Sequence, residues 1–468
     1  MNDQREDYVR ELAKQHVSRR DILAIGAKLG LSTMALTTIL SKTDALSALA
    51  ASGGGWPKTA VSEPKSQVTI TVSHAWEASF WPRQLQFDRD FMKRHPNIKV
   101  KAENTPFANY LTKYLTQAAG GSLPDLMYCQ YAWIQNFTKL GTFAPLDSYI
   151  AKQPDFNMSD FTKPSMFAYK KNGHLYAIPY DTGPIIMFYN KNIFDKAKMP
   201  YPGEGWTLDH MKQVAQEITH GSGPGKVFGF GGSPNVLPSP GAADLGPIGL
   251  MPFGAQYLNE PQETKSLIDQ SAAVSAMEWW VDFQKKGLVP SQAEASAMPG
   301  ADPFLFGKVA MSYNGSWYTP NLNQNANFKW DVAPWPRGPK AHVTSAEGSG
   351  YAITNSSQQK DAAWIYLNEY ISTMGQIFMW ASTGRGSPSR NSAWPAFLGS
   401  KYAPQHAKVV QEALNTYATP YVIFGSQGHK ITTAAQSVWD LVVAGKMDVP
   451  QALKQITSTI TPLLSQSM

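Results

Sequence analysis

The chain has 468 residues, and 43% of them are hydrophobic, which is enough to fill the cores of two domains or of one large one. Its 41 lysines and arginines exceed its 35 acidic residues by six, and they are spread along the chain without a long basic run. This distribution argues against a nucleic-acid partner, and the lack of 18 uninterrupted apolar residues after the N-terminal region excludes a polytopic membrane protein.

The residue types that usually carry covalent or metal chemistry are few and scattered. Cys129 is the only cysteine, so an intramolecular disulfide and a thiolate zinc site are excluded, and we expect a small buried hydrophobic residue there. The nine histidines show no paired metal-binding spacing. The serine-nucleophile motif, the P-loop and the dinucleotide-binding glycine motif are missing. We therefore expect no catalytic site of these kinds, no metal and no cofactor.

The N-terminal region predicts an exported protein. Residues 18–23 read Ser-Arg-Arg-Asp-Ile-Leu and resemble the twin-arginine export motif. A weakly apolar stretch follows over 22–40, and residues 48–50, Ala-Leu-Ala, offer a cleavage site of small residues. We predict that residues 1–50 are a cleaved signal peptide and that the protein is periplasmic but not a lipoprotein, because no cysteine stands near that site. The alternative is a soluble amphipathic helix with an incidental arginine pair.

The mature chain begins with the alternating strands and helices of parallel βαβ units. Residues 51–66 contain Gly, Pro and Ser without periodicity and predict a flexible lead-in. Alternating or continuous apolar runs predict the strands, and apolar residues at helical spacing predict the helices. In chain order these elements are a strand at 68–72, a helix carrying Phe80, Phe87 and Phe91 that ends at Pro96, a strand at 98–102, a helix at 110–118 and a strand at 126–129.

Later segments keep mixing the two types of element. Helices are predicted at 272–286 and 362–378, and strands at 309–313 and 351–354. Residues 228–253 are rich in Gly and Pro and predict mostly loop.

A series of short segments is spread in order across nearly all of the mature chain. They are residues 141–150 (GTFAPLDSYI), 176–181 (YAIPYD), 187–192 (MFYNKN), 206–207 (WT), 306–311 (FGKVAM), 315–317 (GSW), 347–350 (EGSG) and 384–390 (GRGSPSR). In sequence, order and spacing these segments resemble the extracellular solute-binding proteins of family 1, the relatives of maltose-binding protein.

The resemblance implies an α/β fold of the periplasmic-binding-protein type II kind, with two lobes, a hinge that the chain crosses several times and a ligand cleft between the lobes. Carried onto this sequence, lobe 1 comprises 67–181 and 348–395, and lobe 2 comprises 182–347 and 396–468. The resemblance also implies a non-enzymatic component of an ABC importer. Such a protein, expected to be a monomer, captures a sugar, oligosaccharide or related polyol and delivers it to permease subunits in the membrane.

Sugars present apolar C–H faces and hydroxyl edges, so a sugar site needs aromatic rings and hydrogen-bonding groups. Trp317 and Tyr318 follow a predicted strand where the family often places a stacking aromatic residue, and we expect ligand contact there. The loops after the first and third strands carry further candidates, for which ligand contact and packing remain open: Trp76, Glu77, Tyr131 and Trp133.

The suggested hinge crossings carry the remaining candidates. Asp181 could accept sugar hydroxyls or could cap a backbone N–H at the hinge. Gly348 and Ser349 lie at the second crossing, where glycine lets the backbone approach a ligand. Arg385 and Arg390 stand in a Gly-rich loop and could donate to hydroxyls or to an anionic group, or could lie on the surface.

A rival reading is a secreted glycosidase or polysaccharide lyase, suggested by export, the 14 tryptophans and scattered acids. Spacing does not test for a pair of catalytic carboxylates, since the two acids can be far apart in the chain. On the same fold, a polyamine, a metal chelate or a sugar phosphate is the alternative ligand.

Overall fold

The computed structural model describes residues 55–167, 169–232, 246–259, 264–298, 302–420 and 427–465. The predicted signal peptide and residues 51–54 lie outside this part of the chain. Within it, no helix is long and apolar enough to cross a membrane.

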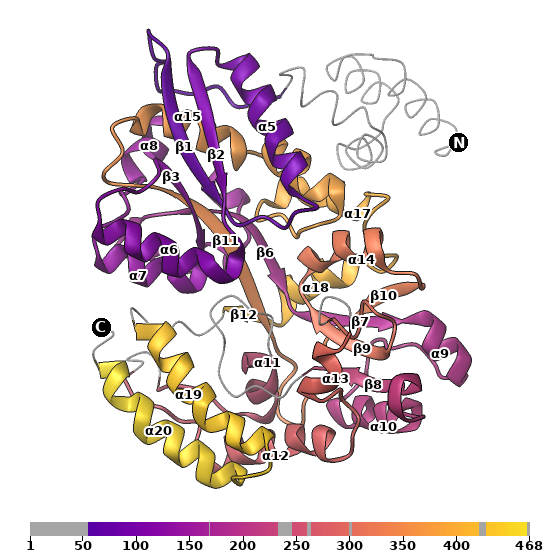
Figure 1. The fold of residues 1–468 in the computed structure, drawn as a ribbon. Coiled ribbons are helices and arrows are strands. Elements are labelled where there is room, and N and C mark those ends of the chain that lie inside the picture. Colours follow the sequence, from indigo (N-terminus) through magenta and orange to yellow (C-terminus); the bar gives the residue numbers. More distant parts are fainter. Residues whose placement is uncertain are drawn as a thin grey trace, which may run out of the picture. The chain divides into compact units, whose positions relative to one another are not determined.

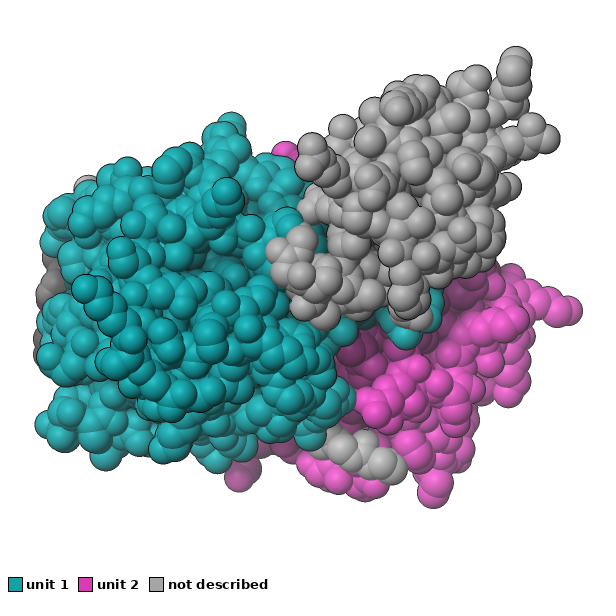
Figure 2. All heavy atoms as spheres, turned by 90° about the horizontal axis from the view of Figure 1, so that it is seen from above, with its two compact units in different colours: residues 1–183, 348–403 teal, residues 184–347, 404–468 magenta. Residues whose placement is uncertain are grey.

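The chain forms two compact units, drawn in separate colours in Figure 2. Unit 1 comprises the chain up to Gly183 and Gly348–Ala403, and unit 2 comprises Pro184–Glu347 and the chain from Pro404. The chain therefore passes between units after residues 183, 347 and 403, where the sequence predicts passages after 181, 347 and 395.

Unit 1 is built on a mixed sheet, in which three neighbouring strands run parallel and the next strand pairs antiparallel with them (Figure 1). Its elements are β1 (Val68–His74), α5 (Trp81–Arg94), β2 (Ile98–Asn104), α6 (Phe107–Ala119), β3 (Leu126–Gln130), α7 (Ile134–Lys139), α8 (Asp147–Lys152), β4 (Lys170–Lys171), β5 (His174–Leu175), β6 (Ile178–Pro184), the second half of β11 (Thr344–Ile353), α15 (Lys360–Tyr370), α16 (Thr373–Met379) and α17 (Trp394–Leu398). β1 pairs in parallel with both β2 and β3, which confirms the predicted βαβ start.

Helices α5 and α15 cover this sheet through aromatic side chains. Phe87 and Phe91, which the helical spacing places on one face of α5, pack edge-on against Tyr366 of α15 at 5.5 and 5.0 Å between ring centroids. Both Phe side chains are buried, as the spacing predicts. Cys129 in β3 is also buried, and burial raises the pKa of its thiol, which confirms the expected hydrophobic role.

Three predicted segments differ from the observed ones. The described part of 228–253, predicted to be mostly loop, forms a strand over Phe228–Gly231 and a short helix over Gly246–Leu250. The helix expected over 362–378 is two helices, because the chain breaks between α15 and α16, where the Ser372 side chain accepts a hydrogen bond from the Gly375 N–H and caps α16. The strand expected at 351–354 is the end of the longer β11, which pairs antiparallel with β3 over Ser349–Ile353.

The described part of the lead-in, residues 55–66, is held against unit 1. The Trp56 ring lies 4.1 Å from the guanidinium carbon of Arg94. The Gln153 side chain accepts from the Ala60 N–H at 3.0 Å, and Asn97 donates to the carbonyl of Pro64 at 2.9 Å. These contacts differ from the flexible segment that composition predicts, because the Trp56 ring and hydrogen bonds to the backbone anchor this stretch.

Unit 2 has its own sheet, in the strand order β10-β7-β9-β8. Its elements are β7 (Ile186–Asn190), α9 (Lys191–Ala197), α10 (Leu208–Ile218), β8 (Phe228–Gly231), α11 (Gly246–Leu250), α12 (Ser271–Lys285), α13 (Gln292–Ser296), β9 (Val309–Asn314), α14 (Thr319–Asn325), β10 (Trp330–Ala333), the first half of β11, β12 (Ala418–Pro420), α18 (Lys408–Thr416), α19 (Gly428–Val443) and α20 (Val449–Ser465). Thr207 caps α10 by accepting from the His210 N–H at 3.1 Å.

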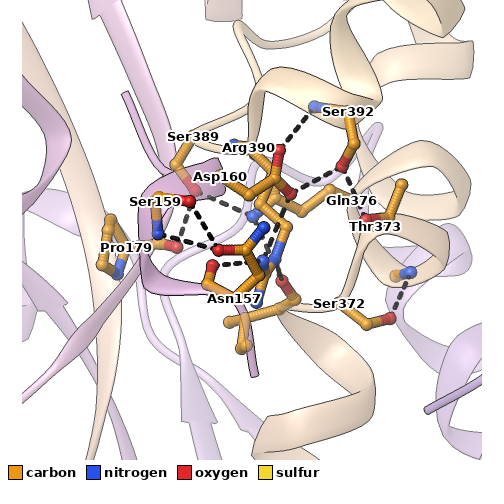
Figure 3. Close-up of polar contacts among 12 residues, drawn as sticks. Asn157, Ser159, Asp160, Pro179, Ser372, Thr373, Gln376, Ser389, Arg390 and Ser392 are labelled. Carbon is orange, nitrogen blue, oxygen red and sulfur yellow. Dashed lines mark hydrogen bonds and ion pairs between the residues drawn. The ribbon is translucent and has the colours of Figure 1, made fainter. Parts of the chain in front are cut away.

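A buried arginine fixes the loops at one edge of unit 1 (Figure 3). Arg390 donates through Nε to the carbonyl of Ile371 at 2.7 Å and through Nη1 to the carbonyl of Asn157 at 3.2 Å and to Asp160 Oδ2 at 3.3 Å. Its guanidinium carbon lies 4.2 Å from the Phe161 ring centroid. Arg390 is 5% exposed, so the surface position that the sequence left open is wrong, and its donors serve the fold.

We predict that Arg390→Met lowers the free energy of unfolding by about 3 kcal/mol or more, because it removes the buried cation that is paired with Asp160 and leaves that carboxylate only its hydrogen bonds from Ser392. Urea denaturation measures the loss. The matched control is Lys408→Met, which breaks the exposed pair with Glu412 and should cost under about 0.5 kcal/mol. Equal losses in the two variants would contradict the structural role of Arg390.

Candidate ligand-binding site

The candidate site in unit 1 is organised around Arg385, which the Gly-rich loop places after α16. Gly384, at a φ of 68°, makes the turn that leads into Arg385, a conformation that favours glycine. The guanidinium carbon lies 4.7 Å from the Trp76 ring centroid and 4.9 Å from that of Phe80. Arg385 is 5% exposed, so it is not the surface arginine that was the open alternative.

Two carboxyl groups lie next to this buried charge. Arg385 Nη2 donates to Glu77 at 2.9 Å from Oε1 and 3.1 Å from Oε2, and its Nη1 lies 3.9 Å from Asp181 Oδ2. Burial alone would lower the pKa of Arg385, but Glu77, Tyr180 and Asp181 raise it above its usual range. The arginine is therefore a permanent cation that holds the Glu77 carboxylate in place.

Glu77 and Asp181 differ in exposure. The Glu77 side chain is 53% exposed, whereas that of Asp181 is 8% exposed. Asp181 Oδ1 accepts a hydrogen bond from the Ser349 N–H at 2.8 Å, which is the backbone-capping role that the sequence left open. Glu77 is thus the carboxylate of this group that solvent reaches.

The backbone of β11 approaches β6 closely at Gly348. A Cβ on Gly348 would lie 2.6 Å from the carbonyl oxygen of Asp181, so a larger residue there would push the two strands apart. Ser349 Oγ shares a hydrogen bond of 2.8 Å with the hydroxyl of Tyr128. Gly348 and Ser349 therefore support the group of Glu77, Asp181 and Arg385 through the packing of β11 and not through an exposed side chain.

The aromatic side chains that the sequence proposed as ligand contacts in unit 1 are buried. Trp76 is 3% exposed, and its indole N–H donates to Gln84 Oε1 at 2.9 Å. Trp133 is 2% exposed and stacks on Tyr110 at 5.6 Å and 13°, and Tyr131 is buried beside it. Their roles as sugar platforms stay predictions.

The unit 2 candidates, Trp317 and Tyr318, lie in one turn between β9 and α14. Both are partly exposed. The Trp317 ring covers Gly315, where an added Cβ would lie 2.1 Å from the ring, and the hydroxyl of Tyr318 donates to Asp302. Gly315 therefore sets the direction of the Trp317 ring.

Sequence reasoning missed the buried polar groups that support the Trp76 ring. Gln84 on α5 links Trp76 to Asp88, to which it donates at 2.9 Å. Tyr370 also donates to Gln84 Oε1. The available signal was the spacing of Gln84 and Asp88, four residues apart on one face of the helix. In the described residues, no group of three or more His, Cys, Asp or Glu could hold a metal ion.

Comparison with known proteins first defines the fold class. The ABC substrate-binding protein of Listeria monocytogenes, solved in complex with cycloalternan, superposes with a TM-score of 0.77 at 24% identity and covers 86% of this chain and all of its own. The chain therefore has the periplasmic-binding-protein type II fold, which confirms the predicted α/β class.

The family follows from sequence. The family model for the bacterial extracellular solute-binding proteins matches residues 73–377, and the chain belongs to that family. A binding protein of Brucella abortus is 26% identical over 320 residues, which are 66% of this chain and 73% of that protein. The lactose-binding protein of Rhizobium radiobacter is 23% identical over 414 residues, 82% of this chain and 92% of its own.

We predict a pH-dependent stability that Asp181→Asn removes. Burial raises the pKa of Asp181 from 3.8 to about 7, against the opposing effects of Arg385 and the Ser349 N–H. Between those pH values the folded chain keeps a proton that the unfolded chain has released, so the contribution of this carboxyl to stability falls as the pH rises. Urea denaturation should show the wild type losing on the order of 4 kcal/mol relative to the variant between about pH 4 and pH 7. A constant difference would contradict the raised pKa.

Proposed function

We propose that this protein is the extracytoplasmic solute-binding component of an ABC importer and that it captures a sugar, oligosaccharide or related polyol for delivery to a separate permease. The observation that carries the proposal is membership of the solute-binding family over residues 73–377. The named relatives include a lactose-binding protein and a protein solved with cycloalternan, and both ligands are carbohydrates.

The site chemistry of unit 1 supports a hydroxyl-bearing ligand. The Glu77 carboxylate is half exposed and held by one nitrogen of Arg385, so its outward lone pairs can accept sugar hydroxyls. Hydrogen bonds to an ionised acceptor are about twice as strong as neutral ones. Partly exposed Trp317 and Tyr318 in unit 2 offer aromatic surface for C–H faces.

A thermal-shift screen over neutral sugars, polyols, sugar phosphates and polyamines tests the proposal, because a ligand of the native state stabilises it by RT ln(1 + [L]/Kd). The expected result is a saturable shift with a neutral sugar and recovery of that sugar unchanged. Cleavage of the sugar would favour the rival secreted glycosidase or lyase, and a shift with polyamines or sugar phosphates alone would reject the sugar class.

We further propose export through the twin-arginine route with removal of residues 1–50. Intact-mass analysis of protein from the periplasm should give a chain that begins at or near Ala51. Replacing Arg19 and Arg20 by Lys should block export. A full-length periplasmic protein, or export that survives the double replacement, would contradict this route.

We predict that Trp317→Ala weakens sugar binding at least about tenfold, because an aromatic anchor is typically worth 2 kcal/mol or more. Its stability should fall by less than the roughly 3–5 kcal/mol lost with a core tryptophan, since Trp317 is only partly buried. Trp279→Ala is the control, because Trp279 packs partly buried against the same core cluster of unit 2. Titration calorimetry that shows equal affinity loss in both variants would remove Trp317 from the site.

A further inference from the structure

The ion pair between Glu77 and Arg385 has an asymmetry that bears on which ligands the site accepts. Both Glu77 oxygens lie within 3.1 Å of the same arginine nitrogen, Nη2, so the carboxylate occupies the position from which an external anion would reach that nitrogen. Glu77 is also the exposed partner, with a side chain 53% exposed against 6% for Arg385. Solvent therefore meets the carboxylate, and the arginine lies behind it.

The charges around Arg385 argue against a site in which this arginine binds an anionic ligand. Arg385 supplies one positive charge, and two carboxyl groups, Glu77 and Asp181, lie within 3.9 Å of its nitrogens. The charged groups that act on Asp181 are Arg385 and Glu77 themselves. The sum over the three side chains is therefore zero when Asp181 is protonated and negative when it is ionised.

From this arrangement, and resting on the proposed function, we propose that Glu77 is a selectivity residue that makes the site accept neutral carbohydrates and reject acidic ones such as uronates and sugar phosphates. An acidic group would have to displace Glu77 from Arg385 or be desolvated beside a carboxylate of the same sign. A neutral hydroxyl meets neither cost, because it donates directly to the outward lone pairs of Glu77.

The test compares each neutral sugar of a panel of mono-, di- and trisaccharides with its counterpart oxidised to the uronic acid at C6. Titration calorimetry gives the ratio of the two dissociation constants in the wild type and in Glu77→Gln, which keeps the shape of the side chain and removes its charge. The ratio, acidic over neutral, should fall by at least about tenfold in the variant, because the neutral sugar loses a hydrogen bond to a charged acceptor and the uronate loses a like-charged neighbour.

The matched control is Asp147→Asn, which removes one negative charge from an exposed residue of unit 1 paired with His174. Its ratio should equal that of the wild type, because Asp147 is an exposed, solvent-screened charge outside the group of Glu77, Asp181 and Arg385. A fall of the same size in the control would assign the effect to net charge and overturn the selectivity role.

The two proposals fail in different ways. A wild type that binds no member of the panel would contradict sugar capture itself. A wild type that binds neutral sugars and their uronates equally well, or a ratio unchanged in Glu77→Gln, would overturn the selectivity role and leave sugar capture standing.

Discussion

The candidate site depends on the burial of one permanent charge, that of Arg385. An arginine keeps its proton and its positive charge even when it is buried, so the surrounding chain has to supply a compensating negative charge. Glu77 supplies it, Asp181 from a segment about a hundred residues away adds to it when ionised, and Trp76 places a ring over the guanidinium. The close approach of β11 at Gly348 brings the Ser349 N–H to Asp181. Together these contacts hold the buried arginine in one position.

Much of the fold was predictable because local patterns determine it. Apolar alternation and helical spacing gave β1, α5, β2, α6 and β3 in the right order, since a half-buried strand and an amphipathic helix each leave a period in the sequence. The family resemblance, carried by short segments such as 384–390, selected the residues that meet around Arg385. Loops after the carboxyl ends of parallel strands converge, which is why Trp76 and Glu77 were candidates.

The direction and burial of side chains were not predictable from the sequence. Arg385 and Arg390 stand five residues apart in one Gly-rich loop, yet one holds Glu77 while the other ties Asp160 and two carbonyls into the fold. Gln84 looks like an ordinary polar helix residue until Trp76 is seen to donate to it. The break between α15 and α16 rests on a single serine cap within an apolar run. Such features are set by tertiary partners, which leave no period in the sequence.

The most direct measurement is a crystal structure of the protein with a bound neutral oligosaccharide. The account predicts a sugar hydroxyl within hydrogen-bond distance of the Glu77 carboxylate, with the pair between Glu77 and Arg385 intact. A sugar bound away from Glu77, or one that displaces Glu77 and bonds to Arg385 directly, would contradict it.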